Sequence, residues 1–410
     1  MMSELYELPN GWEWKTLSEC TELITKGTTP TTNGYKFLDK GINFLKIENI
    51  VNGKIDLSTI EMYISEEAHQ SQKRSQLEEN DVLFSIAGTI GDTAIVKKEH
   101  LPMNTNQAIA LIRPKKILNS SFLRYSLLSI VSENTKDKQR GGAIKNISLG
   151  DIKELMYPLP PLPEQQRLVK KIDSLFEKID KSIALHQKNI DEANAFMGSV
   201  LNEVFGELEV EKGVSLKDIT TKIGSGATPS GGQKAYKTEG INLIRSMNVH
   251  DYGFRFKNLA FIDDTQAKKL SNVTVEANDV LLNITGASVA RCCIVDESIL
   301  PARVNQHVSI IRLKNDMLPR FLHYYLISPS IKSDLLFSSS GGATREAITK
   351  SMIEGFTVPL PSILIQQKVV NYLDSVSQKM EKVKTIQKDK MANLKALKAS
   401  LLDRAFRGEL

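Results

Sequence analysis

Side chains that can recognise DNA bases recur beside the predicted strands in both halves of the chain. Arginine and lysine pair with the edge of guanine, asparagine and glutamine pair with adenine, and further basic residues hold phosphates. The candidates in the first half are Lys26, Lys46, Asn49, Thr89, Asn104, Asn106, Gln107, Lys145 and Asn146. The candidates in the second half are Arg245, Asn248, Asn283, Thr285, Ser288, Arg291, Arg303, Asn305, Gln306, Thr344 and Arg345. These residue types predict a DNA-binding surface rather than a reaction centre.

Each candidate taken alone also fits a plain structural role, as a solvated surface residue or as an amide that caps a turn. The pairs Asn106-Gln107 and Asn305-Gln306 occur in both halves, so they also suit buried amides that tie a loop to a strand. Positions that differ between the halves are better candidates for base recognition. Such positions are Lys145-Asn146 against Thr344-Arg345, and Thr89 against Ser288 or Arg291. These differences would let the two halves recognise different sequences.

Motifs for catalysis are missing or incomplete. The glycine-rich stretch 224–232 lacks the Gly-Lys-Ser/Thr ending of a P-loop, and no Gly-x-Ser-x-Gly nucleophile motif occurs. The one Pro-Pro pair follows Leu159, so the Asn/Asp-Pro-Pro-Tyr/Phe loop of DNA amino-methyltransferases is absent. The six histidines are scattered without a triad. We therefore expect a protein that binds and does not catalyse.

Composition sets further limits. The formal net charge of +5 permits a polyanionic partner without requiring one. Three cysteines, two of them adjacent, form no disulfide framework and indicate a reducing compartment, and no Cys-x-x-Cys or His-x-x-x-His spacing suits a metal. The first residues lack the apolar core of a secretory signal, and no run approaches the roughly 18 apolar residues of a membrane span. We expect a cytoplasmic protein without a metal site.

The sequence is a tandem duplication. Gly27-Thr28-Thr29-Pro30 returns as Gly226-Ala227-Thr228-Pro229, a shift of 226 − 27 = 199. Asn106-Gln107 returns as Asn305-Gln306 with the same shift, and Pro158-Leu159-Pro160 returns as Pro359-Leu360-Pro361 with a shift of 359 − 158 = 201. Two copies of one unit imply two equivalent sites, for which a two-part target is the natural ligand.

Each copy has a mixed part followed by a helical part. In the first copy, the pattern predicts strands at 43–51, 81–86, 93–96 and 108–113 and a helix at 121–131. In the second copy, it predicts strands at 242–249, 279–284, 291–295 and 308–313 and a helix at 320–328. Strands mixed with helices without strict alternation predict the α+β class.

A long helix is predicted in each copy after the proline-rich connector, because apolar residues there follow a heptad pattern. His186 interrupts the first stripe, and Gln387 with Lys390 interrupts the second. The predicted seam residues are Ile172, Phe176, Ile179, Ile183, Ile190, Met197, Val200, Val204, Leu373, Val376, Met380, Val383, Leu394, Leu397 and Leu401. The simplest partner of each stripe is the other helix, which predicts an antiparallel coiled coil with pseudo-two-fold symmetry. The alternative is that each helix packs only on its own domain.

The predicted order is a recognition domain at 1–160, a helical spacer at 161–207, a second recognition domain at 208–361 and a second spacer at 362–410. With this plan, the chain resembles a specificity subunit of a type I restriction-modification system. The resemblance covers essentially the whole length. Its most specific motif is Pro158-Leu159-Pro160-Pro161-Leu162-Pro163-Glu164-Gln165-Gln166. Further support comes from the two Gly-x-Thr-Pro turns and the two Asn-Gln pairs. The remaining motifs are Pro9-Asn10-Gly11-Trp12-Glu13 and the pair Asp81-Val82-Leu83-Phe84 and Asp279-Val280-Leu281-Leu282. The second copy has Ser362 where the first has a proline and lacks the Pro-Glu at the helix start.

This resemblance implies two target-recognition domains that each recognise one half of a bipartite DNA site, with the helices as a spacer. It implies a subunit without catalytic activity that recruits two adenine-methylating modification subunits and the DNA-translocating restriction subunits. S-adenosylmethionine, ATP and Mg are then expected in those partners, with no cofactor in this chain.

Two other classes stay open from the residues alone. A structural adaptor would use the duplicated domains to bind protein, and its binding would be less sensitive to salt than DNA binding. A standalone nuclease would cleave DNA with a metal ion, although acid clusters with nuclease spacing are missing from the sequence.

Overall fold

The computed structural model describes residues 6–138, 147–208, 213–229, 231–339 and 347–410. The chain forms two compact units: unit 1 is Met1–His186 with Asp389–Leu410, and unit 2 is Gln187–Lys388. The two long helices, α4 (Leu162–Gly206) and α9 (Ile363–Phe406), therefore each supply residues to both units. Within the described ranges, no helix combines the length and the apolar composition needed to cross a bilayer.

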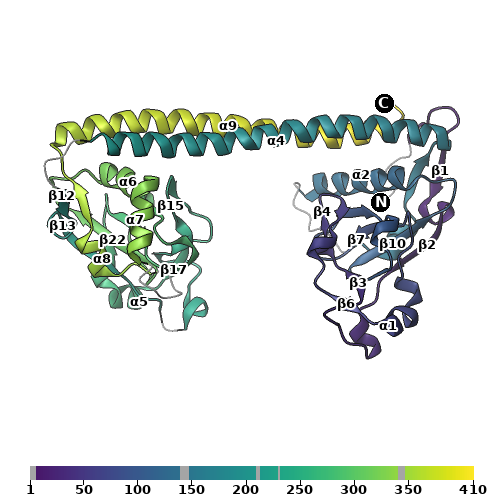
Figure 1. Cartoon of the computed structure of the whole chain (residues 1–410), viewed down its shortest axis with the longest axis horizontal. Coiled ribbons are helices and arrows are strands. Elements are labelled where there is room, and N and C mark those ends of the chain that lie inside the picture. Colours follow the sequence, from purple (N-terminus) through teal and green to yellow (C-terminus); the bar gives the residue numbers. More distant parts are fainter. Residues whose placement is uncertain (1–5, 139–146, 209–212, 230, 340–346) are drawn as a thin grey trace. The chain divides into compact units, whose positions relative to one another are not determined.

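Short strands and helices build the rest of each unit (Figure 1). Unit 1 contains β1 (Glu13–Thr16), β2 (Thr21–Lys26), β3 (Ile42–Leu45), β4 (Ile50–Val51), β5 (Lys54–Ile55), β6 (Tyr63–Ile64), α1 (Glu66–Ser71), β7 (Val82–Ser85), β8 (Thr93–Ile95), β9 (Met103–Thr105), β10 (Ile109–Pro114), α2 (Ser120–Lys138), α3 (Leu149–Lys153) and β11 (Met156–Leu159). Unit 2 contains β12 (Gly213–Ser215), β13 (Thr220–Ser225), β14 (Ile241–Ile244), β15 (Val249–His250), β16 (Gly253–Phe254), β17 (Ala260–Ile262), α5 (Asp264–Lys269), β18 (Thr274–Val275), β19 (Val280–Asn283), β20 (Cys292–Ile294), β21 (Ala302–Val304), β22 (Val308–Leu313), α6 (Pro319–Ile327), α7 (Pro329–Ser339), α8 (Lys350–Gly355) and β23 (Thr357–Pro359).

The two units share one plan. The main sheet has the order β2-β10-β7-β8 in unit 1 and the equivalent order β13-β22-β19-β20 in unit 2. A second sheet has the order β6-β3-β9 in unit 1 and β17-β14-β21-β18 in unit 2. It mixes strand directions, because β3 pairs with β9, and β14 with β21, in parallel. These sheets confirm the α+β class and the duplication.

Two predicted strands, 43–51 and 242–249, are wrong as single strands because a short turn interrupts each of them. β3 ends at Leu45 and β14 ends at Ile244. The Oδ1 atom of Asn49 then accepts from the backbone N–H of Lys46 at 2.8 Å, and Asn248 does the same for Arg245 at 3.0 Å. A side-chain amide that satisfies the backbone locally competes with the strand ladder, so the chain turns before β4 and β15.

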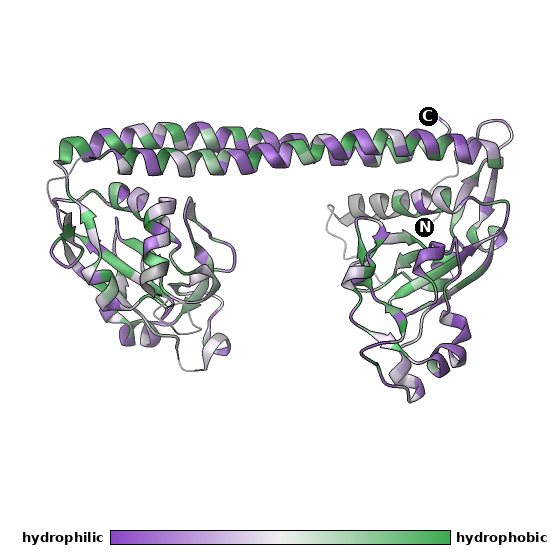
Figure 2. Ribbon diagram, viewed as in Figure 1, coloured by the Kyte–Doolittle hydropathy of each residue, from purple (hydrophilic) through white to green (hydrophobic). Residues whose placement is uncertain are grey.

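Each unit has one core between its main sheet and the long helices and another between its main sheet and its second sheet. In unit 1, Phe122 on α2 packs with Ile112 of the sheet and Ile172 of α4, so α2 lies between the sheet and α4 (Figure 1). In unit 2, Phe321 on α6 belongs to the same kind of cluster with Leu373 of α9. Figure 2 shows the strands as mainly apolar and the long helices as mixed. The long helices are thus integral to the first of these cores in each unit, which explains why each needs an apolar stripe.

The first glutamine after the proline-rich connector fixes the start of each long helix. Gln165 is fully buried; its Nε2 donates to the carbonyls of Pro160 and Ile117, both at 2.9 Å, and its Oε1 accepts from the backbone N–H of Asn119 at 2.8 Å. Gln366 makes the same three bonds to Pro361, Asp316 and Leu318. The second helix therefore starts in the same way although it lacks the Pro-Glu pair.

We expect Gln165→Ala to destabilise unit 1 by about 2 kcal/mol, because the change leaves an N–H and two carbonyls buried without partners. Chemical denaturation of the full chain measures this loss. Gln166→Ala, at the next position along the same helix turn, is the matched control and should have little effect. Equal stabilities for the two variants would contradict the role assigned to Gln165.

The long helices run antiparallel in each unit. In unit 1, the Nζ of Lys398 lies 2.5 Å from Oδ1 of Asp180, and Arg167 donates to the carbonyl of Leu410 at 2.6 Å. In unit 2, the Nζ of Lys384 donates to Oδ1 of Asn194 at 3.0 Å, and Asn189 donates to Gln387 at 3.5 Å. In both units, lower numbers in α4 meet higher numbers in α9, which confirms the predicted antiparallel pairing.

Two predicted seam residues lie elsewhere. Val383 and Leu397 are 36% and 46% exposed, whereas the adjacent Lys384 is only 8% exposed. The Nζ of Lys398 lies 4.6 Å from the ring of Phe176 on the facing helix. Lysine can pack its aliphatic stem against apolar surface while its ammonium reaches a polar partner. At these two places the apolar pattern therefore predicted the residue next to the one that contacts the facing helix: Val383 instead of Lys384, and Leu397 instead of Lys398.

Candidate nucleic-acid interface

Three loops meet at one edge of each main sheet. In unit 1, β2 and β7 end at this edge and β10 begins there, since Lys26 pairs with Ala110 and Ser85 with Ile109. A Cβ atom on Gly27 would collide with the carbonyl oxygen of Thr105, so this turn lies directly against the 105–107 loop. Gly226 lies equally close to Val304 in unit 2. Only glycine permits this approach, which explains why both copies carry the turn.

A threonine and a glutamine then join the turn to the loop in each unit. Thr29 Oγ1 donates to Oε1 of Gln107, and Thr228 donates in the same way to Gln306. The preceding asparagines hold the loop itself: Asn106 accepts from the N–H of Ala108 at 3.1 Å, and Asn305 accepts from that of His307 at 3.0 Å. The Asn-Gln pairs thus position the edge, and the glutamines remain exposed.

Four further asparagine candidates are buried and hydrogen-bonded inside the protein. Their side chains are 0 to 4% exposed. The Nδ2 atoms donate as follows: Asn49 to the Thr59 carbonyl at 2.7 Å, Asn248 to the Arg255 carbonyl at 2.8 Å, Asn104 to Ser75 Oγ at 3.0 Å and Asn283 to the Ser246 carbonyl at 2.9 Å. These amides hold the loops that frame the edge.

Two arginine candidates and one threonine are also engaged. The guanidinium of Arg245 lies 5.3 Å from the ring of Tyr236 and donates to the carbonyl of Asn258. Arg303 donates to the carbonyls of Ala267 and Ala302, and burial lowers its pKa. Thr285 Oγ1 contacts Nδ1 of His307. Arg303 therefore ties α5 to β21, and its guanidinium is engaged within the protein.

The remaining candidates lie at the edge with exposed or half-exposed side chains: Lys26, Lys46, Thr89, Ser288 and Arg291. Lys46 lies 3.5 Å from Glu48, so its charge is partly compensated. In the part of the chain that the structure describes, Lys26 and Arg291 have no ion-pair partner. Lys145, Asn146, Thr344 and Arg345 lie outside the described residues.

Two polar contacts that the sequence analysis missed are repeated in both units. Arg113 forks onto the buried carboxylate of Asp81 at 2.8 and 2.9 Å, and Arg312 forks onto that of Asp279 at 2.8 Å. The hydroxyl of Tyr324 donates to Asp374 at 2.6 Å, and Tyr125 donates in the same way to Asp173. Comparing polar residues between the two copies, rather than glycines and prolines, is the signal that would have found them.

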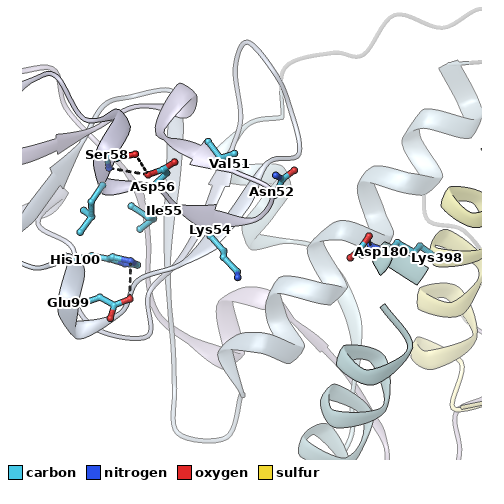
Figure 3. A pocket seen from close by; sticks show the side chains of 11 residues that line it. Val51, Asn52, Lys54, Ile55, Asp56, Ser58, Glu99, His100, Asp180 and Lys398 are labelled. Atoms are coloured by element: carbon cyan, nitrogen blue, oxygen red, sulfur yellow. Dashed lines mark hydrogen bonds and ion pairs between the residues drawn. The ribbon is translucent and has the colours of Figure 1, made fainter. Parts of the chain in front are cut away.

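An open pocket of about 1000 Å³ lies in unit 1 between the β4–β5 turn and the paired helices (Figure 3). Most of its charged groups have partners, and Lys54 is the exception within the described part of the chain. Asp180 pairs with Lys398, and Asp56 accepts from the N–H and the hydroxyl of Ser58. His100 is also paired, since its Nδ1 accepts from the N–H of Lys97 at 3.0 Å. The lining therefore contains no convergent set of groups for catalysis. Among the described residues, no cluster of three metal-ligating side chains occurs.

His323 occupies the position that Arg124 has in unit 1. It is 2% exposed, its Nε2 lies 2.8 Å from the carbonyl oxygen of Asp251, and burial, followed by the charge of Arg320, lowers its pKa from 6.5 to about 4. Unfolding exposes this imidazole, which then takes up a proton below its ordinary pKa. The neutral histidine thus contributes stability above pH 6.5 that is lost as the pH falls towards 4.

We expect this linkage to cost the chain about 2 kcal/mol of unfolding free energy between roughly pH 7 and pH 5. Denaturation of the parent and of His323→Asn at both pH values measures it. The variant should lose less stability on acidification than the parent does. An equal loss in both proteins would show that His323 does not carry this pH dependence.

The fold and the edges define a class of protein: two repeated recognition units with paired helices and different exposed side chains at equivalent edges. A family model described as the type I restriction modification DNA specificity domain matches residues 9–195 and 209–389. The chain belongs to this family and is a specificity subunit of a type I restriction-modification system. This assignment confirms the resemblance drawn from the sequence.

Relatives and solved structures agree. The EcoKI specificity subunit of Escherichia coli K12 is 23% identical and aligns with 98% of this chain and 90% of its own length. The EcoBI specificity subunit of Escherichia coli is 27% identical over 75% of this chain and 70% of its own. A solved chain, from work on complex assembly and conformational transition of the type I R-M system, aligns with 99% of this chain and 100% of its own length, with a TM-score of 0.70 and 24% identity. That likeness shows the fold.

Proposed function

We propose that each unit recognises one half of a bipartite DNA target and that the paired helices set the number of base pairs between the halves. The main support is that the two units have main sheets with equivalent strand orders but present different side chains at the equivalent edges. Lys26 in unit 1 and Arg291 in unit 2 are cations at such edges without an ion-pair partner among the described residues. The chain then supplies recognition, and the chemistry belongs to its partners.

The edges suit this task because their loops are held before DNA arrives. The Thr29–Gln107 and Thr228–Gln306 bonds and the buried asparagines fix the loop backbones. A preorganised surface loses less conformational entropy on binding, so more of the interaction energy appears as affinity. Base contacts would come from exposed loop residues, for which Thr89, Ser288, Lys145, Asn146, Thr344 and Arg345 are candidates, and phosphate contacts from exposed cations.

The spacer role is supported by the helices. α4 is one helix of 45 residues that contributes to both units, and at 1.5 Å per residue it is roughly 68 Å long. Repeated spacings along B-DNA are fixed by about 34–36 Å per helical turn. A helix pair of defined length would therefore select half-sites at a defined separation.

The partners complete the proposal. Two modification subunits would methylate adenines with S-adenosylmethionine, and restriction subunits would use ATP and Mg. The polar outer faces of α4 and α9 are available for docking, as the exposed Lys181 and Lys188 of α4 illustrate.

Salt dependence tests DNA binding by the full-length chain against the structural-adaptor alternative. We expect affinity for a fluorescent duplex several helical turns long to fall steeply and linearly on a log–log plot as salt rises from about 50 to 200 mM. Binding that is flat over this range, or absent, would contradict the proposal and favour the adaptor.

A further inference from the structure

Two hairpins occupy equivalent positions in the two units but differ in charge. The β4–β5 hairpin follows the Asn49 turn, and the β15–β16 hairpin follows the Asn248 turn. The backbone N–H of Asp56 donates to the Asn49 carbonyl at 2.9 Å, and that of Arg255 donates to the Asn248 carbonyl at 2.8 Å. Asp56 and Arg255 therefore occupy the same place in the fold, with opposite charges.

A second pair of equivalent residues, next to these hairpins, also has opposite charges in the two units. Ser85 donates its N–H to the carbonyl of Asp92 at 2.9 Å, and Asn283 donates its N–H to the carbonyl of Arg291 at 2.8 Å. Each residue comes directly before an equivalent strand, β8 or β20. Asp92 and Arg291 are thus equivalent as well, and unit 2 again carries arginine where unit 1 carries aspartate.

The two arginines of unit 2 lie in one neighbourhood. The hairpin lies against β20, since the N–H of Cys292 donates to Oδ1 of Asp251 at 3.1 Å. After burial, the charges of Arg255 and Arg291 are the next causes that lower the pKa of the nearby His250. The nearby carboxylate of Asp251 is neutralised by Lys332 at 2.5 Å. Positive charge therefore dominates this surface.

The hairpin also presents residues suited to a nucleic-acid backbone. Arg255 and Lys257 are exposed, and between them Phe256 is 53% exposed and lies 5.3 Å from the ring of Phe254. In unit 1, the equivalents of Phe256 and Lys257 are Leu57 and Ser58, and Asp56 is occupied in holding Ser58 at 2.6 Å. The unit 1 hairpin carries an exposed lysine of its own, Lys54, but aspartates stand at both arginine positions. A duplex phosphate would therefore be attracted more strongly to the first surface than to the second.

We propose that Arg255, Lys257 and Arg291 form a phosphate-binding surface of unit 2, and that unit 1 lacks cations at the three equivalent positions, so that the two halves of a DNA target are held unequally. The inference rests on the proposed function, since it names a backbone contact within DNA recognition. It predicts stronger electrostatic anchoring in unit 2, with unit 1 relying more on base contacts. Because the contacts are to phosphates, they act on all sequences alike.

The test compares paired charge removals in the full-length chain. Arg255→Ala with Arg291→Ala should lower affinity for a random-sequence duplex roughly tenfold and reduce the salt slope by about two, one for each lost phosphate contact. Arg255→Lys with Arg291→Lys should keep the slope, since charge is retained. Lys268→Ala with Lys269→Ala on α5, apart from β15 in Figure 1, removes the same charge and should leave the slope close to that of the parent.

The outcomes distinguish a failure of the phosphate-binding surface from a failure of DNA recognition. If the parent binds with a steep slope and the arginine pair behaves like the α5 lysine pair, the phosphate surface is refuted while DNA recognition stands. If the parent shows no salt-dependent binding, both fail. An unchanged thermal unfolding midpoint for all three variants shows that the folds are intact, as expected because Arg255, Lys268 and Lys269 are exposed and Arg291 is half-exposed.

Discussion

Inserting one heptad into both paired helices is expected to lengthen the gap between the recognised half-sites by about three base pairs. A heptad adds roughly 10.5 Å of helix, and one base pair occupies roughly 3.4 Å of B-DNA. The insertion sites are 191–200 in α4 and 377–387 in α9, which face each other through Asn194 and Lys384. A whole heptad in both helices keeps the seam in register.

Mapping methylated adenines in a host that carries the variant and its modification partner measures this effect. Both half-sites should keep their sequences, since no edge residue changes. A matched control exchanges the same segments for a different sequence of equal length and the same heptad pattern, and it should leave the gap as it was. A change in either half-site, or an unchanged gap, would count against the helices as the spacer.

Arg113→Met is expected to cost unit 1 about 3 kcal/mol of stability. The change leaves the carboxylate of Asp81, which is 0% exposed, without its forked partner, and an unpaired buried charge is strongly destabilising. Methionine keeps most of the volume, so the loss reports the charge pair rather than packing. Hydrogen exchange should show lost protection in the peptides of β7 and β10, with unit 2 unaffected.

Lys115→Met is the matched control. Lys115 is exposed and donates to the carbonyl of Glu19 at 2.8 Å, so its removal should cost less than about 1 kcal/mol. Arg312→Met should have a similarly large effect in unit 2, because Arg312 pairs with the buried carboxylate of Asp279 in the same way. Losses of similar size for Arg113→Met and Lys115→Met would show that the buried fork does not stabilise the sheet.

The sequence predicted the plan of the fold well because its signals were periodic or repeated. The 199-residue shift revealed two copies, and β22 begins and ends where its apolar run does. Heptad spacing predicted the long helices, since a stripe of that length needs a partner. The pattern was wrong where local side-chain bonds prevailed, as at Asn49 and Asn248, which turn the chain inside an apolar run.

The positions of individual side chains were harder to predict. Hydrophobicity favoured Val383 and Leu397 for the seam, but the lysines beside them face inward because their ammoniums find Asn194 and Asp180 across the pair. Asparagine suits a buried turn as well as it suits contact with the edge of adenine. Residue type alone therefore could not show that Asn104 is buried rather than exposed for contact with a base. That distinction depends on burial, which requires the three-dimensional packing of loops from distant parts of the chain.

The most direct test of the central claim is the adenine methylation pattern that this chain directs when expressed with its modification partner. We expect one motif with two defined parts separated by a fixed number of unspecified base pairs, absent when the chain is omitted. A single uninterrupted motif, or a pattern that is the same without the chain, would contradict recognition of two half-sites by two units.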